Sequence, residues 1–122
     1  MSVEVVERFL EARAAGDIEA CVALAADRAT WHSPVGEPQH GRPGFRAALE
    51  DAYAETSWFA TETLGVRPHE DVFAAQVRNR GERDGQELDS LQLLVFRVED
   101  GLIVDVRIHV DDERAVAEFW AD

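Results

Sequence analysis

The chain has 122 residues, 46% of them hydrophobic, and we expect one globular domain over residues 1–122. Its formal net charge of −13 repels phosphate backbones, which argues against a nucleic-acid partner, and no apolar stretch is long enough to cross a membrane. The chain has no lysine, which excludes Schiff-base chemistry and a P-loop, and Cys21 is its only cysteine, which excludes an internal disulfide.

The N-terminal segment predicts two helices. Apolar residues at helical spacing predict the first helix over residues 3–15: Val3, Val6, Phe9, Leu10 and Ala14. Gly16 is expected to end it, and Asp17 is expected to cap a second helix that carries apolar residues as far as Ala25. Cys21 lies on that apolar face, and we interpret it as a small core residue rather than a nucleophile.

A short strand and a third helix follow. Residues 29–33 predict the strand, and the turn-forming residues 34–38 stop it. The third helix is expected to begin near Pro43, because proline is favoured in the first turn of a helix. Its apolar residues keep the helical spacing: Phe45, Ala48, Leu49, Ala52 and Tyr53.

The second half is mostly strand. Strands are predicted near residues 58–66, 72–80, 88–98 and 102–110. The dipeptides Asp84-Gly85 and Asp100-Gly101 favour tight hairpin turns, so the last three strands should form an antiparallel meander. Asp111 is expected to cap a short final helix that ends in Phe119 and Trp120. These two aromatic residues could dock on the domain, close the mouth of a pocket or cover a partner.

This order of elements predicts an α+β fold. We expect a cone-shaped roll, in which a curved, mostly antiparallel sheet packs against three N-terminal helices. A strongly bent sheet with helices across its open side leaves an interior where a small ligand can bind.

A resemblance to one superfamily runs over most of the chain. The similar segments are VVERF at residues 5–9, AGD at 15–17, ALAAD at 23–27, AT at 29–30, PVGEP at 34–38, LVFRV at 94–98 and IVDVR at 103–107. Together they resemble bacterial ketosteroid isomerases and their superfamily, which includes nuclear transport factor 2, SnoaL-like polyketide cyclases and limonene epoxide hydrolases. Because this fold hosts many activities, the resemblance implies the fold more firmly than any one reaction.

The resemblance also places the residues that perform catalysis in the superfamily. The isomerases use a tyrosine, a base aspartate and a protonated aspartic acid, and these positions fall on Phe9, Ser33 and Leu94. The inward aspartate of the cyclases and epoxide hydrolases falls on Ile108. None of these replacements supplies the missing acid or base, so the resemblance implies the fold without the usual chemistry.

The alternation of side chains along the strands predicts which residues face the interior. Twelve of them form the expected ligand pocket: Phe9, Trp31, Ser33, Leu49, Tyr53, Val77, Asn79, Gln92, Leu94, Val106, Ile108 and Val110. Ala75 and Phe96 share this face. The polar members either bind a small ligand or are satisfied by the backbone within a filled core. We favour the pocket, because burial of Ser33 and Gln92 would otherwise be unfavourable.

The remaining polar residues give weak signals. His32 should point away from Ser33, His40 and His69 lie in turns, and His109 should lie on the convex face of the sheet unless the strand register is shifted by one residue. No histidine, cysteine or carboxylate spacing resembles a metal site, and residues 111–113 suit a helix N-terminus, so we expect no metal and no cofactor. No signal-peptide pattern opens the chain, which favours a cytoplasmic protein.

Two hypotheses for function remain. The first is a domain that binds a small apolar molecule, with no reaction assigned. The second is a non-enzymatic module that forms a homodimer through the convex face of the sheet. Leu91, Leu93 and Val95 alternate with the inward residues, so that strand is apolar on both faces and should be covered twice. An open interior would favour the first hypothesis and a filled interior the second.

Overall fold

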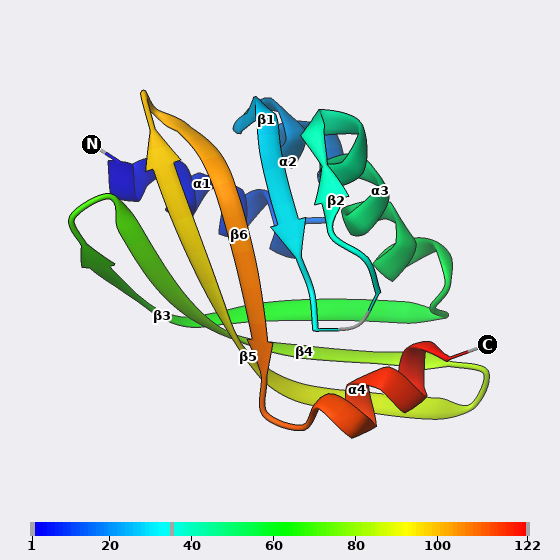
Figure 1. The fold of residues 1–122 in the computed structure, drawn as a ribbon. Coiled ribbons are helices and arrows are strands. Elements are labelled where there is room, and N and C mark those ends of the chain that lie inside the picture. The colour runs from blue at the N-terminus through cyan, green and yellow to red at the C-terminus, as the bar shows by residue number, and fades with distance from the viewer. Residues whose placement is uncertain (1, 35, 122) are drawn as a thin grey trace.

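The computed structural model describes residues 2–34 and 36–121, and it has the expected α+β architecture (Figure 1). Val35 of the expected turn lies outside the described residues. The helices are α1 (Ser2–Ala14), α2 (Ile18–Ala23), α3 (Gly41–Ala54) and α4 (Glu113–Trp120). The strands are β1 (Ala25–His32), β2 (Gln39–His40), β3 (Trp58–His69), β4 (Val72–Arg83), β5 (Gln86–Glu99) and β6 (Leu102–Val110).

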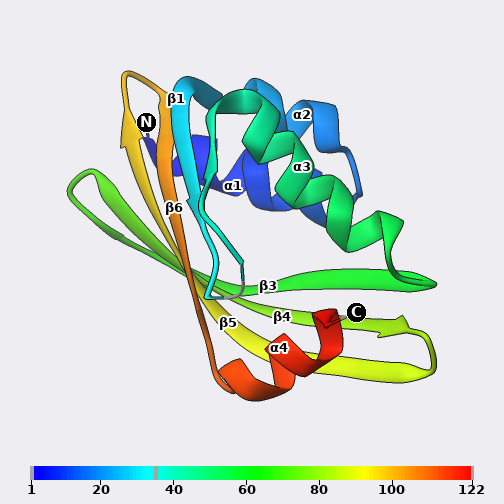
Figure 2. The ribbon, with the colours of Figure 1, turned by 45° about the vertical axis from the view of Figure 1, so that its right-hand side comes forward.

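Within the described residues, the strands form a six-stranded sheet in the order β2-β1-β6-β5-β4-β3. β1 runs parallel to β6, and all other neighbouring strands are antiparallel, so the predicted meander of the last three strands is confirmed. The sheet bends strongly, and α1, α2 and α3 lie together against its concave side (Figure 2). The predicted cone-shaped roll is therefore confirmed.

The aspartate–glycine turns have the backbone that hairpins need. Asp84 and Gly85 have φ values of 51° and 81°, and Asp100 and Gly101 have values of 52° and 77°. Two consecutive residues with positive φ match the right-handed twist of the adjoining strands. These turns therefore set the registers of β4 with β5 and of β5 with β6.

The end of α1 and the start of α2 have the predicted caps. Gly16, with φ 75°, donates its backbone N–H to the Arg13 carbonyl oxygen, and the Asp17 N–H donates to the Ala12 carbonyl oxygen. This pair of bonds closes the C-terminus of α1. The Asp17 carboxylate then accepts a hydrogen bond from the Ala20 N–H and caps α2.

Several elements differ from the prediction in their bounds or caps. β1 begins at Ala25, which we expected in the second helix, because the Leu24 carbonyl oxygen accepts a hydrogen bond from the Ile103 N–H and aligns the chain with β6. β2 was not predicted and pairs with the end of β1. Asp112, not Asp111, caps α4, and the Asp111 carboxylate instead accepts a hydrogen bond from the Ser90 hydroxyl group.

The core fills the end of the cone that the helices cover. Phe9 of α1 lies at its centre, with ring centroids 6.2 Å from Trp31, 6.1 Å from Phe45 and 5.5 Å from Phe96. The burial pattern of β4 and β5 confirms the predicted alternation, with inward residues such as Ala75 and Leu94 fully buried.

Candidate functional site

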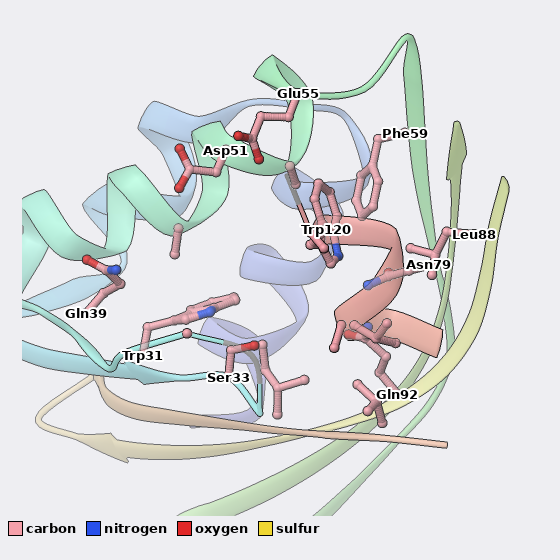
Figure 3. Close-up of a pocket in the computed structure, with 18 of the residues that line it drawn as sticks. Trp31, Ser33, Gln39, Asp51, Glu55, Phe59, Asn79, Leu88, Gln92 and Trp120 are labelled. Atoms are coloured by element: carbon pink, nitrogen blue, oxygen red, sulfur yellow. The ribbon is translucent and has the colours of Figure 1, made fainter. Parts of the chain in front are cut away.

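The concave side of the sheet holds an open cavity of about 440 Å³. Residues from β1, β4, β5 and β6 form its floor, α3 forms one wall and α4 forms another. Figure 3 shows Trp31 and Ser33 on one side of this space, facing Asn79 and Gln92 on the other, with Trp120 and Phe59 between them and α3. The volume is within the range of small-molecule sites, about 300–1,000 Å³.

Six of the twelve predicted pocket residues line this cavity: Trp31, Ser33, Asn79, Gln92, Ile108 and Val110. The other six do not line it: Phe9, Leu49, Tyr53, Val77, Leu94 and Val106. Except for Tyr53, these belong to the packed core at the other end of the cone, where the Phe9 ring occupies the interior. Strand alternation predicts the face of a residue but not its depth in the cone, so it could not separate the two groups.

Tyr53 supports the site from behind. Its hydroxyl group donates a 2.6 Å hydrogen bond to the Arg13 carbonyl oxygen, and its ring packs edge-on against the Phe59 ring, which lines the cavity. Burial raises the pKa of the Tyr53 hydroxyl group, so it stays protonated as a donor at neutral pH. Tyr53 therefore ties α3 to the end of α1.

Arg13 is the main cavity residue that the sequence analysis missed. The last turn of α1 places it at the cavity, where it is only 7% exposed. Its guanidinium carbon lies 5.6 Å from the centre of the Trp31 ring, within cation–π distance. A signal was present, because residue 13 continues the spacing of Val6, Phe9 and Leu10 on the buried stripe of the helix.

Two buried polar atoms in the cavity wall have no hydrogen-bond partner in the described part of the chain. They are Nη1 of Arg13 and Oδ1 of Asn79. Burial lowers the pKa of Arg13, with Tyr53 and Cys21 acting in the opposite sense, but the guanidinium group still carries its charge at neutral pH. The cavity is thus less apolar than expected.

Carboxylates line the cavity toward solvent. Asp51 of α3 and Glu55, the C-cap residue of α3, are both exposed, and Figure 3 shows both on the α3 side of the cavity. Glu37, in the loop before β2, is exposed and also lines it. Carboxylates on a helix are usually solvated, so their position at a cavity could not be recognised from sequence. Across residues 2–34 and 36–121, no histidine, cysteine and carboxylate group has the arrangement of a metal site.

The C-terminal helix closes one side of the cavity. Phe119 is buried against Leu88 and Val116, whereas Trp120 lines the cavity and contacts the Phe59 ring. Of the roles foreseen for these aromatic residues, Phe119 therefore docks and Trp120 forms part of the wall. Arg83 holds the helix in place, because its Nη1 donates hydrogen bonds to the carbonyl oxygens of Phe119 at 3.0 Å and Ala121 at 2.7 Å.

A family model described as SnoaL-like domain matches residues 6–106. The chain belongs to the SnoaL-like domain family. Bal32a from a soil-derived mobile gene cassette is a similar solved structure, with 30% identity, a TM-score of 0.93, and coverage of 98% of this chain and 96% of that chain. A putative SnoaL-like polyketide cyclase from Jannaschia sp. CCS1 is 15% identical, with a TM-score of 0.82 and coverage of 99% and 92%.

TerC, co-crystallised with polyporic acid, is 13% identical to this chain, with a TM-score of 0.84 and coverage of 97% and 96%. At these low identities, TerC and the Jannaschia protein show likeness of fold alone. Comparison with curated proteins gave no match. The expected superfamily is therefore confirmed by the SnoaL-like family match.

The structure of this SnoaL-like domain also locates the four positions that the resemblance assigns to catalysis. Phe9 and Leu94 are fully buried in the core, whereas Ser33 and Ile108 line the cavity. Burial raises the pKa of Cys21 to about 11, so its thiol is protonated at neutral pH, as befits a core residue. Of these four positions, the two that line the cavity hold a serine and an isoleucine, and the charged group buried in its wall is the Arg13 guanidinium group.

The histidines lie away from the cavity, since none of them lines it. His32 Nε2 lies 3.1 Å from the Asp105 carboxylate, in a pair across the β1–β6 seam. His40, His69 and His109 are exposed. None of the helices in the described part of the chain has the length and apolar character needed to span a bilayer.

Proposed function

We propose that this SnoaL-like domain binds a small, mainly apolar organic molecule in the cavity between Trp31 and Trp120. The observation that carries the proposal is an open cavity of about 440 Å³ with two amide side chains buried at its wall. Asn79 is 3% exposed and Gln92 is 8% exposed, and a filled core has no use for such polar groups. The co-crystallisation of TerC with polyporic acid supports a ligand-binding role for this fold.

The proposal does not include ketosteroid isomerisation. That reaction needs a base to abstract a proton and acidic donors to stabilise the enolate, and the matching positions hold Ser33, Phe9 and Leu94. We expect a Δ5-3-ketosteroid to remain unchanged when incubated with the protein, followed by absorbance of the conjugated enone. Conversion that depends on the protein would show that this placement of residues is wrong.

The binding proposal can be tested with 2-naphthol, a neutral aromatic probe, by isothermal titration calorimetry. Ala52 lines the cavity, and Ala54 is an exposed residue two positions later on α3. We expect Ala52→Phe to fill part of the cavity and weaken binding at least tenfold, and Ala54→Phe to leave the Kd within twofold. Equal binding by both variants would show that the probe binds elsewhere.

We also propose homodimerisation through the convex face of the sheet. Leu91 and Leu93 are 42% and 40% exposed on β5, and Leu93 lies beside Gln76 and His109 on the neighbouring strands. A second copy of the same face would cover these leucines by two-fold symmetry. This surface could serve a ligand-binding protein or an association module, but the open cavity favours ligand binding.

Light scattering coupled to size exclusion tests the dimer. We expect the protein to elute at twice the mass of one chain, and Leu93→Glu to convert it to a monomer. Ala54→Glu introduces the same charge on the helical side and should leave the dimer intact. A wild-type mass equal to one chain would contradict this proposal without affecting the first.

A further inference from the structure

Arg13 is a buried cation with no carboxylate partner among residues 2–34 and 36–121. It is 7% exposed, and no described carboxylate forms an ion pair with it. Other arginines do have carboxylate partners: Arg28, Arg42, Arg46, Arg78, Arg107 and Arg114. A chain with 25 acidic residues could readily supply a partner, and an unpaired buried charge is destabilising. The missing counter-ion is therefore informative.

The surroundings of Arg13 hold it in place at the cavity. Its backbone carbonyl oxygen accepts hydrogen bonds from the Tyr53 hydroxyl group and the Gly16 N–H, at 2.6 Å and 3.0 Å. Its guanidinium group lies near the face of Trp31, which is itself 5% exposed. A cation that is held in advance loses little conformational entropy when an anion binds.

Asn79 lines the same cavity and has an unpaired acceptor. Its Oδ1 atom is buried and has no hydrogen-bond partner among the described residues. Figure 3 shows Asn79 entering the cavity from β4, on the side opposite Trp31. A ligand that satisfies both groups carries an anion for Arg13 and a hydrogen-bond donor for Asn79.

The rest of the wall restricts the ligand further. Trp31, Phe59 and Trp120 present aromatic surface to the cavity, which suits a flat apolar body. Asp51 and Glu55 line it toward solvent, and their charge disfavours a second anionic group there. The expected ligand thus carries a single negative charge, at the end that meets Arg13.

We propose that the cavity selects an aromatic monocarboxylate, whose carboxylate binds the Arg13 guanidinium group and whose hydroxyl or N–H group donates to Oδ1 of Asn79. The planar guanidinium group suits a carboxylate because it can donate two parallel hydrogen bonds. This inference rests on the proposed function and specifies the charge and orientation of the ligand.

The test compares 6-hydroxy-2-naphthoate with its neutral primary amide by calorimetry on the full chain. We expect the carboxylate to bind wild-type protein at least tenfold more tightly than the amide. Arg13→Gln should reduce that ratio below twofold and change amide binding by less than threefold. Arg8→Gln removes an exposed arginine from the same helix and should preserve the ratio.

A stability measurement distinguishes a ligand-binding role of Arg13 from a purely structural one. Arg13→Met removes the unpaired charge and keeps an apolar chain of similar length, so we expect a Tm equal to or above that of the wild type. At the same naphthoate concentration, the rise in Tm should be larger for the wild type than for Arg13→Met. If Arg13→Gln does not fold, Arg13→Met provides the binding comparison as well.

The outcomes separate this inference from the proposed function. Equal Kd values for carboxylate and amide, or a ratio preserved in Arg13→Gln, would overturn the inference while 2-naphthol binding upholds the cavity as a site. Failure of all three probes to bind would overturn both. The role of Asn79 is tested with the 6-methoxy analogue, which should bind wild-type protein at least threefold more weakly than the 6-hydroxy acid. If the methoxy group weakens binding to Asn79→Leu by the same factor, Asn79 does not accept the hydrogen bond.

Discussion

Replacing Arg83 with methionine should release the helix that closes the cavity. Arg83 is 9% exposed, and its Nη1 donates to two carbonyl oxygens at the end of α4. A helix of eight residues is not stable alone in water, so α4 depends on its docking contacts. Methionine keeps most of the apolar stem of arginine and removes both hydrogen bonds.

The size of the effect follows from these two bonds. A hydrogen bond from a charged donor contributes about 1.5–3 kcal/mol. The contributions should not add fully, because both bonds come from one nitrogen atom and the exposed Ala121 carbonyl oxygen can be hydrated after release. We therefore expect α4 to lose about 2 kcal/mol of local stability, which corresponds to about 30-fold faster amide exchange.

Hydrogen–deuterium exchange with mass spectrometry measures this directly. Peptides covering residues 113–120 should exchange faster in Arg83→Met, while peptides from β1 should be unchanged. Arg80→Met alters an exposed arginine of the same strand and should leave α4 protected. Unchanged exchange of α4 in Arg83→Met would refute the view that this side chain holds the cavity wall.

Three further predictions concern stability, measured by urea unfolding. Burial raises the pKa of Cys21 to about 11 from an ordinary 9.0, so the folded state favours the protonated thiol. The free energy of unfolding should therefore fall as the pH rises from 9 to 11. An equal fall in Cys21→Ala would contradict this explanation. A Cβ atom on Gly44 would lie 2.9 Å from the Gln39 backbone carbon, so Gly44→Ala should cost about 1–3 kcal/mol. A loss below about 0.5 kcal/mol would show that β2 can shift to accommodate the methyl group. Asp112→Ala should cost about 1 kcal/mol through the lost cap of α4. An equal loss of stability in Asp111→Ala would contradict the assignment of the cap.

Local chemistry predicted most of the fold. The Asp84-Gly85 and Asp100-Gly101 turns depend on residues next to one another, and the alternation of β5 depends on a period of two. The start of β1 could not be predicted in this way. Alanine fits a helix or a strand, and Ala25 joins the sheet because β6, from the other end of the chain, lies beside it.

The sequence predicted which side chains face the interior, but not how far the cavity extends into it. The inward positions of Trp31, Asn79 and Gln92 follow from strand alternation, and all three line the cavity. The cavity ends where the Phe9 ring fills the cone, which depends on three-dimensional packing. Arg13 was visible only as a charged residue on a buried helical stripe, a pattern that arginine can also satisfy by extending to solvent.

The pairing of β1 with β6 brings both halves of the chain together around the cavity. Arg13 and Trp31 come from α1 and β1, in the N-terminal half of the chain. Asn79 and Gln92 come from β4 and β5, which β6 joins to β1 in the sheet. If the chain were divided between α3 and β3, each fragment would carry only part of the lining. A molecule bound in the cavity would then report that the two fragments had reassembled, and its binding energy would favour their association.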